Sequence, residues 1–321
     1  MKSMLRIIFA VTALSTCVYA QQASDIHVLH VQGNVYMVVG AVGNIAVQVG
    51  SDGILMVDTG SAQMTDQVLA AVKQIAKPVT NKPLRYIINT HFHPDHTGGN
   101  EKARLMGKTI TGGNVAGNIS DASEGAAIYA HANVLKAMSA PTGKQAPTPA
   151  ESWPTDTYFS DTKELFFNGE ALQMLHPKSA HTDGDSIVFF RRSDVVMTGD
   201  IFSTTTYPII DLQNGGSLNG IVDALNFILD ITIPADKQEG GTMVIPGHGR
   251  LCDEADVVEY RDMVTIIRDR IQDMVKKGMT LEQVKAAKPT RDYDPLYGAT
   301  TGFWTTDMFV EAAYKSLSAK K

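Results

Sequence analysis

Hydrophobic and polar positions change their spacing along the chain, and each change predicts a different element. Residues 34–57 contain three short apolar runs separated by turns that carry glycine, a pattern typical of antiparallel strands. Residues 65–76 are predicted to form a helix, because their apolar side chains recur three and four positions apart. The run 84–89 has the pattern of a buried strand, and a helix is expected to start at 100–105. Strands followed by strand–helix units predict a sandwich of two sheets covered by helices.

The middle of the chain continues this alternation. A strand and a helix are predicted over 127–138, and two hairpins begin near residues 164 and 186. Between them, residues 141–154 hold four prolines and no periodicity. We expect a mobile loop there, beside the active site.

After residue 248 the apolar positions return to helical spacing and continue as far as Gly278. A capping box at 280–283 opens the next helix. The tail that follows is rich in aromatic side chains: Tyr293, Tyr297, Phe303, Trp304 and Phe309. These aromatic side chains could pack on the sandwich or form a contact between subunits. The sequence does not choose between the two, so it does not predict the oligomeric state.

The N-terminus has the three parts of a secretory signal. Lys2 and Arg6 precede a short apolar run, and small residues lead to Ala20. The run is shorter than the ~20 apolar residues that span a bilayer. We expect residues 1–20 to be removed, which leaves 21–321 as one domain with a helical tail from about 255, in the periplasm or outside the cell. A lipoprotein signal over 14–17 is the alternative, although Thr16 fits poorly before Cys17.

Charge and cysteine content narrow the class of protein. The chain has a formal net charge of −6, so it lacks the basic face that nucleic acid requires. No later stretch is apolar enough for a membrane span. Cleavage after Ala20 would leave Cys252 as the single cysteine, which excludes an internal disulfide and favours a role as a small apolar filler. A small-molecule substrate is the expected partner.

The closest cluster of side chains able to bind a metal follows the strand predicted at 84–89. His91, His93, Asp95 and His96 stand within six residues. Side chains two positions apart on an extended backbone point the same way, and the chain then turns at Pro94. Imidazole and carboxylate suit zinc, iron or manganese, and ligands that leave in two directions suggest two neighbouring metals. A polar loop with incidental histidines is the alternative, but it does not explain so tight a cluster.

This cluster resembles the HxHxDH signature of the metallo-β-lactamase superfamily. The family's other landmarks are also found in order, each after an apolar run or before a small residue: Asp58, His181, Asp200 and His248. The resemblance covers about residues 30–250. It implies an α+β protein with the αββα sandwich fold, in which two mixed β-sheets are flanked by helices.

The resemblance also implies a role for each landmark. His91, His93 and His181 would hold one zinc ion, Asp95, His96 and His248 a second, and Asp200 would bridge both. Asp58 would fix the loop that carries the histidines. Asp95 would orient the attacking hydroxide. Separately, Tyr207 lies in a loop just after Asp200 and is our candidate for hydrogen bonding to the substrate.

The residue type at position 200 helps to choose between the activities found in the superfamily. One β-lactamase branch has a cysteine at this position and another has a serine, whereas a bridging carboxylate is typical of thioesterases, lactonases and phosphodiesterases. We therefore expect a dinuclear zinc hydrolase that acts on a lactone, thioester or β-lactam type of carbonyl. The alternatives are a true metallo-β-lactamase, an oxidoreductase like the persulfide dioxygenases with a single iron, and a metal-stabilised binding protein without catalysis.

Overall fold

The computed structural model describes residues 25–109, 125–139 and 146–319. The expected signal peptide therefore lies outside the described residues, as does part of the proline-rich loop. The described strands are β1 (His27–Gln32), β2 (Val35–Val39), β3 (Ile45–Gly50), β4 (Gly53–Val57), β5 (Leu84–Ile88), β6 (Ala127–His131), β7 (Asp156–Tyr158), β8 (Thr162–Phe167), β9 (Glu170–Leu175), β10 (Ile187–Phe190), β11 (Val195–Met197) and β12 (Met243–Ile245).

The described helices alternate with these strands and then dominate the C-terminal part of the chain. They are α1 (Thr65–Ala76), α2 (Pro94–Thr97), α3 (Asn100–Met106), α4 (Ala132–Ser139), α5 (Leu218–Ile231), α6 (Glu254–Lys276), α7 (Leu281–Ala287), α8 (Asp294–Tyr297) and α9 (Thr306–Ser318). Short 3-10 turns are η1 (Ala62–Met64), η3 (Ala150–Ser152), η4 (Gly199–Ile201) and η5 (Leu212–Asn214). None of these helices is long and apolar enough to cross a membrane.

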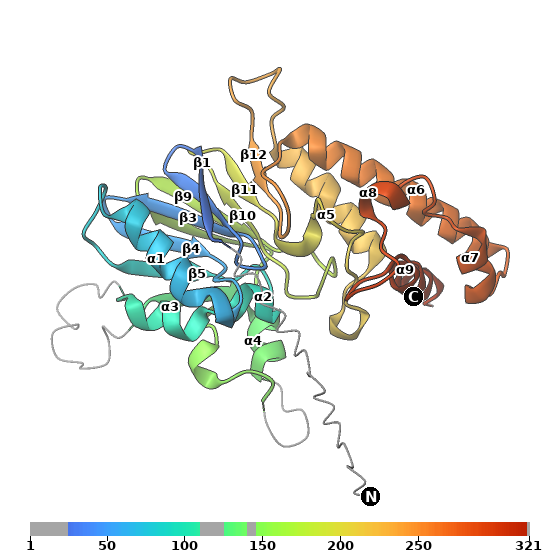
Figure 1. The fold of residues 1–321 in the computed structure, drawn as a ribbon, viewed down its shortest axis with the longest axis horizontal. Helices are drawn as coiled ribbons and strands as arrows, with labels where there is room; N and C mark the ends of the chain where they lie inside the picture. The colour runs from blue at the N-terminus through green and yellow to red at the C-terminus, as the bar shows by residue number, and fades with distance from the viewer. Residues whose placement is uncertain (1–24, 110–124, 140–145, 320–321) are drawn as a thin grey trace, which may run out of the picture.

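The strands form two mixed sheets, as the resemblance implied. The larger sheet runs β1-β2-β3-β4-β5-β6-β7, antiparallel up to β4 and parallel from β4 to β7. The smaller sheet runs β12-β11-β10-β9-β8, with the single parallel pair between β11 and β12. The chain therefore has the αββα sandwich fold, with helices on the outer face of each sheet (Figure 1).

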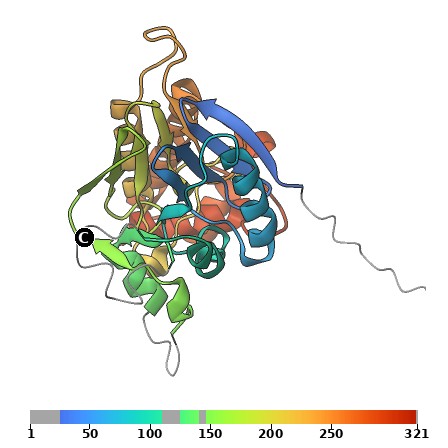
Figure 2. The same ribbon diagram turned by 90° about the vertical axis from the view of Figure 1, so that its left-hand side faces the viewer.

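Three apolar clusters hold these layers together. Met37 and Leu55 of the larger sheet pack with Leu172 and Phe190 of the smaller one to form the core between the sheets. Helices α1 and α3 cover the outer face of the larger sheet. Helices α5, α6 and α9 cover the smaller sheet, across the sandwich from α1 (Figure 1), and lie behind the sheets in the turned view (Figure 2). Burial of these apolar faces is the main force that stacks the layers.

The aromatic tail packs mostly onto this outer helical layer. Phe309 stacks on Tyr207 with ring centroids 4.7 Å apart, and Tyr297 meets Tyr260 edge to face at 5.5 Å. Phe303 is different, because its side chain is 84% exposed. Cys252 is buried within the same apolar cluster, as expected of a filler.

Candidate active site

The site lies where strands of both sheets end. His91 and His93 follow β5, while Asp95 and His96 sit on the single-turn helix α2. Asp200 lies in the 3-10 turn after β11. His248 follows β12, and His181 lies in the connection from β9 to β10. Because β4, β5, β11 and β12 belong to parallel pairs, their C-terminal ends bring these loops together at one edge of the sandwich.

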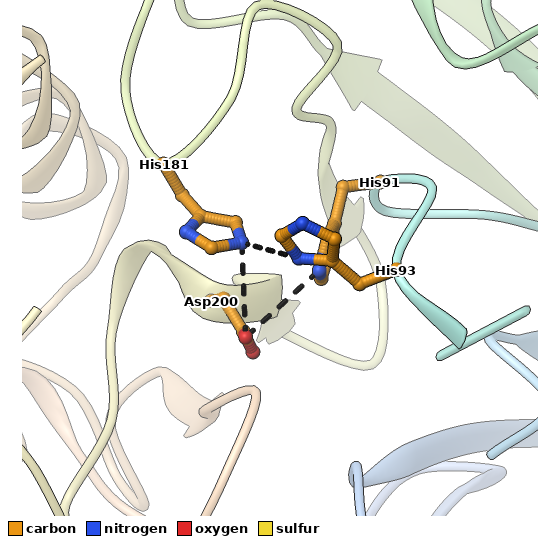
Figure 3. A group of neighbouring side chains, drawn as sticks. All are labelled: His91, His93, His181 and Asp200. Atoms are coloured by element: carbon orange, nitrogen blue, oxygen red, sulfur yellow. Dashed lines mark hydrogen bonds and ion pairs between the residues drawn. The ribbon is translucent and has the colours of Figure 1, made fainter. Parts of the chain in front are cut away.

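The first group comprises His91, His93, His181 and Asp200, whose ligand atoms all lie within 4.8 Å of one another. Nε2 of His181 is 2.9 Å from Nδ1 of His93. Oδ2 of Asp200 is 3.8 Å from Nε2 of His181 and 3.9 Å from Nε2 of His91 (Figure 3). Figure 3 shows the three rings and the carboxylate pointing toward a common centre.

The second group comprises Asp95, His96, Asp200 and His248, with the same 4.8 Å limit. Oδ1 of Asp200 is 3.1 Å from Nε2 of His96 and 3.3 Å from Nε2 of His248. Oδ2 of Asp95 is 3.2 Å from Nε2 of His248. Asp200 thus turns one carboxylate oxygen toward each group, which is the geometry of a bridging ligand.

Each histidine uses its outer ring nitrogen to contact an acceptor outside the two groups. The partners are Thr90 Oγ1 for His91, Asp211 Oδ2 for His93, Asp58 Oδ2 for His96, the Ile209 carbonyl for His181 and the Val42 carbonyl for His248. Thr90 Oγ1 can accept from His91 because its own proton is donated to Asp58. A neutral ring that donates from one nitrogen presents a lone pair at the other, so the five rings, when neutral, direct lone pairs toward the centre.

Two further observations fit a bound divalent cation. Nε2 of His91 is buried and has no hydrogen-bond partner. Nitrogen atoms of neighbouring rings face each other at 2.9 Å between His93 and His181 and at 3.4 Å between His96 and His248. Lone pairs that face each other repel unless a proton or a cation lies between them. Imidazole nitrogen and carboxylate oxygen are suitable ligands for such a cation.

The pKa values of these side chains reflect the same electrostatics. Burial lowers the pKa of His91 well below its ordinary value, which keeps the ring neutral and able to bind a metal. Burial opposes protonation of His96 and His248 too, but the Asp200 carboxylate raises the pKa of both, to about 9 for His248. Burial opposes ionisation of Asp200, yet His96 and His248 hold its pKa well below the usual range. The second group therefore carries negative charge that attracts a positive ion or protons.

Asp58 lies behind the histidine loop and contacts both Thr90 and His96. The side chain is fully buried, and Oδ1 accepts a hydrogen bond from the Thr90 amide. Oδ2 accepts from Thr90 Oγ1 and from Nδ1 of His96. The backbone of Asp58 has a positive φ of 63°, a conformation that few residues other than glycine adopt. Asp58 thus fixes both the start of the histidine loop and one ring within it.

The sequence analysis missed two carboxylates that orient ligands. Asp211 accepts the hydrogen bond from His93, and Asp185 binds the amide and hydroxyl of Thr182 next to His181. Asp185 lies four residues after His181, and Asp211 lies in the loop after Asp200. These positions near predicted ligands were the only signal in the sequence that pointed toward the site.

Tyr207 does not reach the site, contrary to the expectation of substrate contact. Its side chain is 1% exposed, and its hydroxyl donates to Oδ1 of Asp294 and the carbonyl of Thr290. Its ring packs within the apolar cluster of the outer helical layer, where it stacks on Phe309. Tyr207 therefore anchors the C-terminal tail to the sandwich.

A cavity of about 690 Å³ opens directly above the two groups. Its floor is made by His93, Asp95, Asp200 and His248. Its walls come from three places in the chain: Val42, the loop residues Thr205, Thr206 and Ile209, and the tail residues Ala299, Thr301, Phe303 and Trp304. Residues 146–154, the described part of the proline-rich loop near the site, do not line this cavity, so that expectation is not met there.

Comparison with known proteins agrees with this architecture. The model of the metallo-beta-lactamase superfamily matches residues 31–248. The chain therefore belongs to the metallo-β-lactamase superfamily, and its two groups of histidine and aspartate side chains could hold metal ions.

Individual relatives include two kinds of hydrolase. The linear primary-alkylsulfatase of Pseudomonas sp. (strain ATCC 19151) is 27% identical over 270 residues, which are 73% of this chain and 48% of that protein. The stereoselective inverting sec-alkylsulfatase Pisa1 from Pseudomonas sp. superposes with a TM-score of 0.62 at 14% identity, over 90% of this chain and 50% of that one. The DIM-1 metallo-beta-lactamase superposes with a TM-score of 0.52 at 16% identity, over 75% of this chain and 97% of that one. The chain spans about half the length of the alkylsulfatases it matches.

Proposed function

We propose that the protein is an exported, dinuclear zinc hydrolase that cleaves an ester, thioester or amide bond of a small molecule. The observation that carries the proposal is the placement of Asp200, which faces a complete ligand group with each of its two carboxylate oxygens. The two groups fit zinc, since each offers imidazole nitrogen together with carboxylate oxygen. A pair of zinc ions, when bound, supplies a hydroxide nucleophile near neutral pH and polarises the carbonyl oxygen.

The residues of this chain position the reactants. Asp95 lines the cavity and has its pKa lowered, because His248 and His96 outweigh the effect of burial. Its carboxylate therefore stays ionised and can accept a hydrogen bond from the attacking water. Asp58 and Asp211 hold His96 and His93 in place. The walls of the cavity reduce the access of bulk water to the bound substrate.

A sulfate ester is the second candidate substrate, because two of the relatives are alkylsulfatases. The cavity favours the neutral carbonyl compound. Among the residues that the structure describes, no lysine or arginine lines it. Arg250 lies two positions after His248, but its guanidinium pairs with both carboxylate oxygens of Asp256. Among the described residues that line the cavity, a sulfate group would thus meet no free lysine or arginine.

Metal analysis of protein purified without added metal is the first test. Two zinc ions per chain support the proposal, whereas one iron per chain and oxygen uptake with a persulfide would support the dioxygenase alternative. The zinc protein is then assayed on p-nitrophenyl esters, a thioester, a lactone, a β-lactam and decyl sulfate. Faster turnover of decyl sulfate than of every carbonyl compound would overturn the proposal in favour of the sulfatase, and preference for the β-lactam would favour a true metallo-β-lactamase.

Export is tested on the protein itself. Expressed in a Gram-negative host, the processed chain should appear in the periplasm or medium with Gln21 as its N-terminal residue. A lipid-modified Cys17 in the membrane fraction would show that the alternative signal at 14–17 operates. An unprocessed chain in the cytoplasm would contradict both.

A further inference from the structure

The cavity above the metal-binding groups has two chemically different ends. Its polar end is the floor of histidine and carboxylate side chains. The rest of its lining is largely apolar, is called the apolar end below, and includes Ile209, Trp304 and Phe303, which is 84% exposed. Large apolar side chains left open to solvent in a hollow beside a reactive centre are typical of ligand contact.

The tail loop that supplies this apolar end is held firmly at its base. Between α8 and α9, the amide of Thr306 donates to the carbonyl of Ala299 at 2.8 Å, and the amide of Ala299 donates to Oγ1 of Thr306 at 3.1 Å. The two bonds close a short loop that carries Phe303 and Trp304 at its far side. Trp304 packs against the outer helical layer. The hydrogen bonds between Ala299 and Thr306 therefore hold in place the loop from which Phe303 and Trp304 line the cavity.

Tertiary contacts fix the tail in register with the site. Tyr207, only two residues before the cavity-lining Ile209, donates its hydroxyl to Asp294 at 2.8 Å in the helix that precedes the loop. Arg270 of α6 donates to the carbonyl of Pro289 and pairs with Asp292. The loop after the metal ligand Asp200 and the aromatic loop of the tail are thus built as one unit, although about ninety residues separate them in the sequence.

We propose that Phe303 and Trp304 determine substrate specificity, by binding the linear apolar chain of a neutral ester whose carbonyl lies at the metal-binding groups. This inference rests on the proposed ester hydrolysis and adds the class of substrate. The apolar end would remove the chain from water, and the described lining residues offer no lysine or arginine to pair with a charged head. Esters of medium-chain fatty acids have this combination of a neutral reactive group and an apolar chain.

The test is the dependence of kcat/KM on chain length, measured with p-nitrophenyl acetate, butyrate and octanoate on the zinc-loaded protein. Full burial of two methylene groups raises kcat/KM by about tenfold. The ratio of kcat/KM for octanoate to kcat/KM for acetate should therefore be well above one. Phe303→Ala should lower that ratio by about tenfold, because the aromatic wall is lost. Phe159→Ala is the matched control, since Phe159 is 81% exposed and does not line the cavity. That control should keep the wild-type ratio.

A binding measurement separates this inference from the proposed function. The chain contains two tryptophans, Trp153 and Trp304, so Trp153→Phe leaves Trp304 as the only indole reporter. Titration with 2-decanone, which cannot be hydrolysed, should shift its fluorescence saturably at concentrations where 2-butanone does not. Trp304→Phe in the wild-type background should remove the response.

Each outcome bears on one of the two proposals. If esters are cleaved with no dependence on chain length, or if Phe303→Ala keeps the wild-type ratio, the inference is overturned and ester hydrolysis stands. If no ester is cleaved but 2-decanone shifts Trp304, the apolar site is supported and the proposed reaction fails. An unchanged Trp304 signal at saturating 2-decanone would overturn the apolar site directly.

Discussion

Oδ2 of Asp211 lies 3.1 Å from Nε2 of His93, on the side of the ring that faces away from the metal-binding groups. The same carboxylate accepts backbone hydrogen bonds from Gln213 and Asn214 through its other oxygen. A carboxylate behind a ligating histidine fixes the ring's orientation and the position of its proton. Asp211 therefore links the fold of the η5 loop to the chemistry of the site.

Asp211→Asn separates these two roles. The asparagine oxygen can keep the backbone bonds, but its amide can no longer accept the proton of His93. We expect metal affinity of the first group to fall by about 10- to 100-fold, with little change in unfolding of the metal-free protein. Competition titration with a chromogenic chelator measures the affinity. Equal affinity in Asp211→Asn and wild type would show that the contact does not orient a ligand.

Asp58→Asn should affect stability as well as the site. Asparagine tolerates the positive φ at this position, so the backbone need not move. It nevertheless loses an acceptor for His96 or Thr90 within a fully buried network. We expect the free energy of unfolding in urea to fall by about 1–3 kcal/mol and metal binding by the second group to weaken. Wild-type stability in this variant would contradict the network.

The two ligand groups should respond differently to single substitutions. His93→Ala removes one ligand of the first group only, so about half of the bound metal should be lost, together with turnover. Asp200→Ser alters both groups and should lower occupancy of both, because Asp200 faces each of them. Metal-to-protein ratios after dialysis distinguish these cases. Full metal content in Asp200→Ser would exclude Asp200 as a bridge.

The buried thiol of Cys252 should make the stability of the folded protein depend on pH in the alkaline range. Burial raises the pKa of its thiol to about 12 from an ordinary value of 9.0. A group whose pKa is raised by folding stabilises the folded state below the unfolded pKa, and this contribution is lost as pH rises through the folded value. Stability should therefore fall between about pH 9 and 12. In Cys252→Ala this part of the loss should be absent, as urea unfolding at pH 8 and pH 10 can show.

Tyr207→Phe tests whether the tail is anchored as the structure indicates. The variant keeps the ring that stacks on Phe309 but loses the hydroxyl bonds to Asp294 and Thr290. We expect a loss of about 1 kcal/mol in unfolding free energy, and the KM for a short ester should stay near the wild-type value. A large rise in KM at unchanged stability would instead restore Tyr207 as a substrate contact.

Local patterns in the sequence were enough to predict most of the fold. Helix α1 has the bounds that its apolar periodicity predicted, and the hairpins around β4 and β10 were found from apolar runs and turn residues. Strands β1 and β7 were missed. Strand β1 is an edge strand without a buried side chain, and β7 is three residues long. Such strands are ordered by pairing with a neighbour, which leaves little periodicity to detect.

The candidate ligands could be predicted from the sequence, because four of them stand within six residues and the resemblance to the superfamily pointed to the others. The groups that surround them became visible only in the folded chain. The carbonyls of Val42 and Ile209 carry no side-chain signal, yet they orient His248 and His181. The cavity joins residue 42 to residues 303–304 through long-range packing. Hydrophobic burial depends on area rather than on a motif, so no local pattern could have shown which aromatic residues of the tail face the site.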